Sequence, residues 1–262
     1  ITFEPVTETY WADMGKVWPS GHQQAGEPIM LRDYQVDAIN KFLTNTQALQ
    51  EIATGAGKTI TTATLSHLAE KYGRTITIVP NKSLVEQTEE DFINVGLDVG
   101  VYYGDRKNLD KTHTICTWQS LNIFDKKSKN HEYAIMSLAE FLADVKTVIV
   151  DEVHMAKADA LKTLLTSVMA RVPIRWGLTG TVPKEKFESQ ALLVSLGPVI
   201  SKLSANELQQ QGVLAQCHVN IVQLQDHVEY SNYQSELKYL LEESGRLDAM
   251  AELIRHVNET GN

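Results

Sequence analysis

The sequence predicts an α/β domain with a mostly parallel sheet and helices on both of its faces. Short runs of apolar and β-branched residues alternate with helical patterns from about residue 33 to residue 178, and a glycine-rich turn joins one run to a helix. Strands that alternate with helices of this length require βαβ crossovers, which make neighbouring strands parallel. The content of 43% hydrophobic and 22% charged residues is typical of a folded globular chain.

The first predicted element is a short helix over residues 33–43, where Ile39, Phe42 and Leu43 share one side. Strands are predicted at residues 48–53, 75–79, 99–103, 114–117, 147–150 and 174–178. Further helices are predicted from the glycine turn through residue 68, from residue 83, and over about residues 135–142 and 158–170. Ser83 and Glu86 have the spacing of a capping box at the start of the helix from residue 83.

The segments on either side of this pattern differ in character. Residues 1–28 are irregular and punctuated by glycine and proline, which predicts a linker or the remnant of a preceding domain. Ser204 and Glu207 form a second capping box, residues 217–224 are predicted as a strand, and the acidic residues 233–257 as a helix. Because the first residue is Ile1, we expect the sequence to be part of a longer protein.

Composition and charge narrow the possible functions. The 262 residues carry a net charge of −9, which is not typical of a general nucleic-acid binder. Residues 101–186, however, hold 13 basic and 10 acidic residues. This region therefore has two alternative interpretations, a local phosphate-contacting surface or an ordinary solvated surface. No apolar run approaches the ~18 residues that span a bilayer, and no signal peptide is visible. The two distant cysteines, Cys116 and Cys217, favour a reducing, cytoplasmic setting.

A phosphate-binding loop is the sharpest local motif. Residues 53–59 read Ala-Thr-Gly-Ala-Gly-Lys-Thr and lie between a predicted strand and a predicted helix. Glycines let successive amides point at a phosphate, and the helix N-terminus adds its positive dipole end. Ile52 replaces the first glycine of the usual GxxxxGK[ST] pattern, so a turn without a ligand is the alternative. The residues expected to bind a nucleotide are Thr54, Gly55, Ala56, Gly57, Lys58 and Thr59.

Two carboxylates follow the predicted strand at residues 147–150. Asp151 and Glu152 would lie at the carboxyl edge of a parallel sheet, where such sheets bind ligands. Asp151 and the Thr59 hydroxyl are suited to hold Mg²⁺, and Glu152 to orient or deprotonate an attacking water. Alone, an Asp-Glu pair also caps helices. With the phosphate loop upstream, it indicates nucleoside triphosphate hydrolysis with Lys58 and Glu152 as the catalytic residues.

The full set of motifs resembles the superfamily 2 helicases. Residues 151–154 match a DExH box, residues 178–181 match motif III, and residues 31–35 resemble the adenine-reading Q-motif region. Residues 79–87 resemble motif Ia and residues 117–120 resemble motif Ib. All six segments occur in family order over residues 31–182. The resemblance is strongest to the bacteriophage UvsW-type DNA helicases, whose branch tolerates an apolar residue in place of the first loop glycine.

This resemblance implies a RecA-like fold, with ATP and Mg²⁺ as ligands, and it assigns roles to individual residues. Gln35 would hydrogen-bond the adenine edge, with Arg32 and Tyr34 packing beside it. The residues implied to contact the nucleic-acid backbone are Asn81, Lys82, Thr117 and Gln119. The residues implied to couple nucleotide state to that track are His154, Thr179, Gly180 and Thr181. For Trp118, core packing is favoured over a base-stacking platform.

The resemblance also implies a domain order and a function. Residues 29–200 are expected to form the first RecA-like domain, and residues 201–262 the bridge to a second one and its beginning. We expect a monomeric, ATP-dependent helicase or translocase motor that acts on branched or duplex DNA, with no membrane partner. An RNA helicase, a restriction-enzyme motor subunit and a non-unwinding ATP switch are the alternatives. The basic residues 126–129 are expected to form a loop, and these residues, Arg106, Lys107 and Lys111 are either solvated or in contact with a duplex.

Overall fold

One sheet organises the first part of the chain. The computed structural model describes residues 1–132, 136–155, 158–216, 221 and 229–260. Within these residues, eight strands pair in the order β4-β3-β5-β2-β6-β7-β1-β8, and every pairing is parallel except that of β3 with β4. The strands are β1 Gln47–Ile52, β2 Arg74–Val79, β3 Val99–Tyr103, β4 Arg106–Lys107, β5 His113–Thr117, β6 Val145–Val150, β7 Ile174–Thr179 and β8 Val199–Leu203. The predicted mostly parallel sheet is confirmed.

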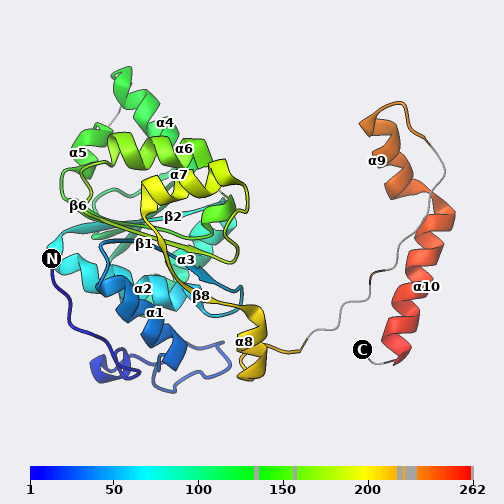
Figure 1. Cartoon of the computed structure of the whole chain (residues 1–262), viewed down its shortest axis with the longest axis horizontal. Coiled ribbons are helices and arrows are strands. Elements are labelled where there is room, and N and C mark those ends of the chain that lie inside the picture. The colour runs from blue at the N-terminus through cyan, green and yellow to red at the C-terminus, as the bar shows by residue number, and fades with distance from the viewer. Residues whose placement is uncertain (133–135, 156–157, 217–220, 222–228, 261–262) are drawn as a thin grey trace. The chain divides into compact units, whose positions relative to one another are not determined.

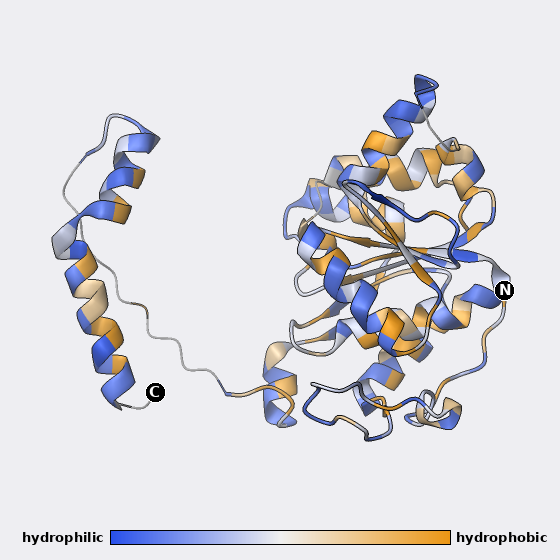
Figure 2. Cartoon of the chain, turned by 180° about the vertical axis from the view of Figure 1, so that it is seen from behind, coloured by the Kyte–Doolittle hydropathy of each residue, from blue (hydrophilic) through white to orange (hydrophobic). Residues whose placement is uncertain are grey.

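Helices cover both faces of this sheet (Figure 1). One face carries α1 Asp33–Leu43, α2 Lys58–Ala69 and α3 Lys82–Asn94. The other face carries α4 Trp118–Lys129, α5 Leu138–Leu142, α6 Ala158–Thr163 and α7 Lys186–Leu196. Apolar residues of the helices face the sheet (Figure 2), where they form two hydrophobic clusters. Phe42 and Leu65 belong to one cluster, and Phe124 and Phe141 to the other.

Helix α3 begins one residue before the predicted capping box. Its N-cap is Asn81, whose Oδ1 accepts a hydrogen bond from the Leu84 amide at 3.0 Å. The prediction that Ser83 caps this helix is therefore wrong, because asparagine two residues earlier supplies the same kind of side-chain acceptor. The second predicted capping box, Ser204 with Glu207, is confirmed at the start of α8 Ala205–Gln210.

Helix α4 has no counterpart among the predicted elements. Thr117 caps it by accepting a hydrogen bond from the Ser120 amide, and its residues Leu121 and Phe124 are buried. The predicted basic loop at residues 126–129 is wrong, since these residues form the last turn of α4. Positive side chains are favourable there because they lie near the negative end of the helix dipole. Helix α7 and strand β8 are also absent from the predicted elements.

Other predicted helices change length. The helix predicted over residues 158–170 ends at Thr163 and continues as a π-helical turn over Leu164–Val168. The helix predicted over residues 135–142 is observed as α5, and residue 135 lies outside the described residues. The strand predicted at residues 217–224 also lies outside them, apart from residue 221.

The contacts within the chain divide it into two units, Ile1–Gln216 and Cys217–Asn262. The second unit contains α9 Tyr233–Glu242 and α10 Ser244–Thr260 in place of the single helix predicted over residues 233–257. The helix breaks at Glu243, which is extended and whose carboxylate accepts hydrogen bonds from the amides of Gly245 and Arg246. The domain boundaries after residues 28 and 200 stay predictions.

The segment before α1 packs on the same hydrophobic core as the sheet. Trp11 is fully buried, and its Nε1 donates a hydrogen bond to the Thr64 hydroxyl of α2 at 2.9 Å. The Asn40 side chain of α1 makes hydrogen bonds to both the amide and the carbonyl of Val6. Residues 1–28 therefore form part of the first unit, and they reach the edge of the loop that follows β1.

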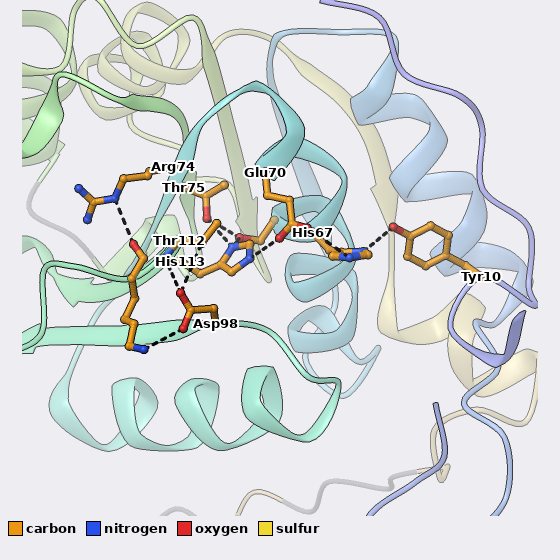
Figure 3. A network of polar contacts seen from close by, with 10 residues as sticks. Tyr10, His67, Glu70, Arg74, Thr75, Asp98, Thr112 and His113 are labelled. Atoms are coloured by element: carbon orange, nitrogen blue, oxygen red, sulfur yellow. Dashed lines mark hydrogen bonds and ion pairs between the residues drawn. The ribbon is translucent and has the colours of Figure 1, made fainter. Parts of the chain in front are cut away.

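A polar network joins this segment to the sheet (Figure 3). The Tyr10 hydroxyl is hydrogen-bonded to His67 Nδ1 at 2.7 Å, and His67 Nε2 lies 3.5 Å from the Glu70 carboxylate. Glu70 also contacts Nε2 of the buried His113 at 2.8 Å, and His113 Nδ1 lies 2.8 Å from the Thr75 hydroxyl. Burial lowers the pKa of His113 despite the neighbouring carboxylate. The N-terminal segment, α2, β2 and β5 are thus connected through one set of side chains.

We predict that Trp11→Ala destabilises the first unit strongly. Removing a fully buried indole and its hydrogen bond is expected to lower the free energy of unfolding by about 3–5 kcal/mol. Met14→Ala is the matched control, because Met14 lies in the same segment and is 42% exposed. Urea denaturation measures both variants. Equal, small effects of the two changes would show that residues 1–28 are not part of the cooperative core.

Candidate nucleotide-binding site

The site lies where β6, β7 and β1 end side by side. These three strands are neighbours in the sheet, and they run parallel, so the segments after them meet at one edge. The phosphate loop follows β1, Asp151 and Glu152 follow β6, and the segment from Thr179 to Thr181 follows β7. Sheet order therefore brings together three motifs that lie in separate parts of the sequence.

The phosphate loop has the backbone that its glycines were expected to permit. Gly55 and Gly57 have φ values of 85° and 77°, in the left-handed region where other residues are strained. Gly57 is also the residue before α2, and a Cβ on it would lie 2.5 Å from Gln35 Nε2. Lys58 and Thr59 begin the helix, so its free amides face the same edge as the loop.

A nearly buried ion pair crosses the site. Lys58 Nζ lies 2.9 Å from Glu152 Oε1, and the two side chains are only 8% and 15% exposed. Lys58 Nζ also donates a long hydrogen bond of 3.4 Å to the Ile52 carbonyl. Glu152 has a φ of 48°, an unusual conformation for a residue with a side chain, and such strain is concentrated at functional sites. The residue expected to bind phosphate and the residue expected to activate water are thus in direct contact.

Asp151 is held beside this pair in an environment that disfavours its charge. Burial, with the neighbouring Glu152 carboxylate as a smaller cause, raises the pKa of Asp151 to about 6. Asp151 Oδ1 accepts a hydrogen bond from the Glu152 amide at 2.8 Å, which fixes the orientation of the carboxyl group. A divalent cation would relieve the cost of the charged form, since an opposite charge stabilises the carboxylate.

The donor set fits Mg²⁺ as the accompanying metal ion. Thr59 and Asp151 supply a hydroxyl and a carboxylate, which are the hard oxygen ligands that Mg²⁺ prefers. Mg²⁺ in nucleotide sites uses one or two protein oxygens together with phosphate oxygens and water. Among the described residues, no group of three or more His, Cys, Asp or Glu side chains is placed to hold a metal ion.

A short chain of hydrogen bonds links the segments after β6 and β7. The Thr179 hydroxyl donates to the Thr181 carbonyl at 2.8 Å, so it accepts from His154 Nδ1, which is also 2.8 Å away. His154 Nδ1 lies 3.4 Å from Glu152 Oε2. Gly180 lies against the phosphate loop, because a Cβ on it would be 3.2 Å from the Thr54 hydroxyl. The four residues expected to couple the nucleotide state to the nucleic-acid track thus connect the carboxylates after β6 with the phosphate loop after β1.

The expected adenine-reading residues hold the phosphate loop from the other side. The Gln35 side chain donates a hydrogen bond from Nε2 to the Ala56 carbonyl at 3.0 Å. Its Oε1 accepts a hydrogen bond from the backbone amide of Arg32, also at 3.0 Å. The Tyr34 hydroxyl donates to the same Ala56 carbonyl at 3.1 Å, and Arg32 donates to Tyr34. These three residues are therefore placed next to the loop, while adenine reading by them stays a prediction.

A cleft of about 550 Å³ opens beside the loop glycines and extends under the N-terminal segment. Its lining includes Gly55, Gly57 and Gln35, together with Trp18, His22 and Glu27. The Trp18 and His22 rings are stacked, with centroids 4.2 Å apart. Sequence reasoning did not assign any residue of this segment to the site. The available signal was the unusual density of aromatic residues in a glycine- and proline-rich stretch.

The residues expected to contact nucleic acid lie at the same edge of the sheet, after strands β2 and β5. Asn81 and Thr117 are the N-caps of α3 and α4, which follow the neighbouring strands β2 and β5. Lys82 is exposed in the first turn of α3, and Gln119 donates a hydrogen bond of 3.4 Å to the Pro80 carbonyl. Trp118 packs against the hydrophobic cluster on the α4 side, in agreement with the favoured core interpretation.

Fold and site together define a RecA-like P-loop nucleoside triphosphatase domain. A family model described as "Type III restriction enzyme, res subunit" matches residues 28–184. The chain belongs to this family, and the predicted resemblance to superfamily 2 helicases is confirmed. Among the described residues, no helix is long and apolar enough to cross a membrane.

Curated relatives include helicases of phages and archaea. The ATP-dependent DNA helicase UvsW of Enterobacteria phage T4 is 22% identical over 237 residues, covering 84% of this chain and 44% of the relative. The DNA 3'-5' translocase XPB2 of Sulfurisphaera tokodaii is 28% identical over 187 residues, covering 70% of this chain and 38% of the relative. This chain thus spans less than half the length of these relatives.

Solved structures support the fold. The UvsW helicase from bacteriophage T4 superposes with a TM-score of 0.58 at 18% identity, covering 76% of this chain and 69% of that one. The Hef helicase domain of Pyrococcus furiosus has a TM-score of 0.53 at 21% identity, covering 67% and 39%. At these identities the likeness establishes the architecture.

We predict that Asp151→Asn stabilises the fold at neutral pH. The raised pKa means that the folded state binds a proton more readily, so Asp151 costs stability as the pH rises from about 4 through 6. The amide variant should gain on the order of 1–3 kcal/mol at pH 7 and little at pH 4. Thermal denaturation from pH 4 to 8 measures this, with the exposed Asp105→Asn as control. An unchanged pH profile would contradict the assigned environment.

Proposed function

We propose that this chain is the ATP-binding motor domain of a DNA helicase or translocase. The observation that carries the proposal is the contact between Lys58 and Glu152, with Asp151 beside them, at the edge where the phosphate loop ends. Such a set of charges serves triphosphate hydrolysis and is not needed to stabilise a sheet. The relatives named above as DNA helicases and translocases support DNA as the track.

In this proposal, ATP binding exchanges the partner of Lys58. The Lys58 ammonium leaves Glu152 for the β- and γ-phosphates, and the amides of the loop hold the same phosphates. Thr59 and Asp151 would hold Mg²⁺, which supplies positive charge against the phosphate oxygens. The Glu152 carboxylate, released from Lys58, is then free to accept a proton from the attacking water or to orient it.

Adenine selection and coupling follow from the neighbouring groups. Gln35 would offer its amide to the adenine edge, with Arg32 and Tyr34 beside it, while it keeps the loop in place. His154 and the segment from Thr179 to Thr181 would transmit the state of Glu152 towards a second RecA-like domain. We place that domain in the same polypeptide, with residues 201–262 as the bridge to it, and the working protein in the cytoplasm as a monomer.

The track would run across the start of α3 and α4. Helix N-termini present free amides to phosphates, and Asn81, Thr117 and Gln119 lie at these two starts beside the exposed Lys82. Contacts to the backbone suit a motor that steps along any sequence. Nucleic-acid-stimulated ATP turnover by the longer protein distinguishes this motor from a non-unwinding ATP switch, which would show no stimulation.

We predict that Lys58→Ala and Glu152→Gln separate binding from hydrolysis. Lys58→Ala removes the counter-charge of the γ-phosphate and should abolish turnover and weaken ATP binding. Glu152→Gln keeps the shape of the site and frees Lys58 from its carboxylate, so ATP affinity should be maintained or increased while turnover stalls. Binding of a fluorescent ATP analogue and steady-state phosphate release measure the two effects. A parallel loss of affinity in Glu152→Gln would instead make Glu152 a structural residue.

We predict that Lys82→Ala weakens DNA binding equally for unrelated sequences. A lost phosphate contact should reduce the slope of log K against log salt by about 0.9 for duplex DNA, without any change in sequence preference. Lys238→Ala is the control, because Lys238 is an exposed lysine of α9 in a similar i,i+4 pair. Fluorescence anisotropy at several salt concentrations measures the effect. A sequence-selective loss would contradict backbone tracking.

A further inference from the structure

A cluster of charged side chains surrounds the hairpin formed by β3 and β4. Arg106 on β4 donates two hydrogen bonds to Glu89 of α3, from its two terminal nitrogens to the two carboxylate oxygens, both at 2.7 Å. The Arg106 side chain is 47% exposed, whereas that of Glu89 is 15% exposed. The hydrogen bonds to Glu89 raise the pKa of the Arg106 guanidinium above its ordinary value. The cation is therefore accessible to solvent but occupied on its fork-shaped edge.

A second cation lies in the same cluster. Lys82 of α3 is 3.8 Å from the Glu86 carboxylate, and Glu86 also accepts a hydrogen bond of 2.8 Å from the Tyr103 hydroxyl. The Tyr103 ring lies near both cations, with its centroid 5.8 Å from Lys82 Nζ and 5.9 Å from the Arg106 guanidinium carbon. One buried aromatic ring thus places the two basic groups on one surface, and each of them faces a carboxylate of α3.

Strand register places this surface in line with the proposed track. Tyr102 is opposite Cys116 and Val79 is opposite Thr117 in the parallel pairs β3–β5 and β5–β2. Tyr103 and Thr117, the last residues of β3 and β5, and Asn81, which follows β2, therefore lie at one edge of the sheet. The hairpin continues the row that begins with α3 and α4, and Arg106 is at its outer end.

We propose that Arg106 is a further nucleic-acid contact, whose guanidinium is held by Glu89 until a backbone phosphate takes the place of that carboxylate. The proposal rests on the DNA-motor function proposed above and adds a residue to its track. The guanidinium fork binds carboxylate and phosphate with the same two-donor geometry, so the exchange of partners needs no new arrangement of donors. Glu89 keeps the arginine oriented and lowers the positive charge of this surface when no nucleic acid is bound.

A double-mutant cycle tests the exchange by fluorescence anisotropy with a mixed-sequence DNA duplex at several salt concentrations. Glu89→Gln should raise the affinity by about two- to fivefold, the range that corresponds to an exposed ion pair. Arg106→Ala should lower the affinity and reduce the salt slope by about 0.9, as expected for one lost phosphate contact on a duplex. The variant with both changes should resemble Arg106→Ala, because the gain from Glu89→Gln requires a free guanidinium. Circular dichroism confirms that each variant is folded.

Glu90→Gln is the matched control. It removes the same charge one residue further along α3, and the structure shows no hydrogen bond or ion pair of its exposed side chain among the described residues. A gain from Glu89→Gln that equals that of Glu90→Gln, or that persists with Arg106→Ala, would overturn the exchange while leaving DNA binding by Lys82 intact. Absence of DNA binding by every variant, the unchanged chain included, would overturn the DNA-motor function and the exchange together.

Discussion

The ion pair between Lys58 and Glu152 is the interaction on which the site depends. Two charges that are almost removed from water cost free energy unless they compensate each other, so the Lys58 ammonium and the Glu152 carboxylate each depend on the other. Their contact requires that β1 and β6 end at the same edge with only β7 between them. The strand order, the left-handed conformation of Glu152 and the first turn of α2 together position Lys58 Nζ 2.9 Å from Glu152 Oε1.

The groups around this ion pair lower the stability of the fold, because the site concentrates charged side chains where burial and backbone strain disfavour them. Burial disfavours the ionised form of Asp151, and Glu152 adopts a strained backbone conformation. Functional sites commonly retain such unfavourable features because the rest of the fold compensates for them. Here the compensation comes from the two hydrophobic clusters and from the N-terminal segment, where Trp11 is fully buried.

Much of the fold could be predicted from local sequence because strands and motifs have short-range signals. The β-branched run at residues 75–79 and the Gly-Lys-Thr turn each indicate their own structure, and the strand at the first position and the start of a helix at the second are confirmed. Choices between equivalent local solutions could not be predicted as well. Asn81 rather than Ser83 caps α3, and the polar surface of α4 concealed a helix whose only buried residues are Leu121 and Phe124.

Side-chain partners depend on tertiary contacts and were beyond sequence reasoning. The phosphate loop and the carboxylates were identified separately, but only the sheet order shows that Lys58 contacts Glu152. Trp18 and His22 line the cleft because the N-terminal segment folds back along α2, which no local pattern indicates. The pairing of Arg106 with Glu89 likewise joins residues 17 positions apart, one on a hairpin and one on the helix before it.

A crystal structure of the chain with Mg²⁺ and a non-hydrolysable ATP analogue tests the central claim most directly. The account predicts that Lys58 Nζ moves from Glu152, now 2.9 Å away, to within hydrogen-bonding distance of the β- and γ-phosphate oxygens. Glu152 should then face the γ-phosphate without its cationic partner. An intact contact between Lys58 and Glu152, with the phosphates bound elsewhere, would contradict it.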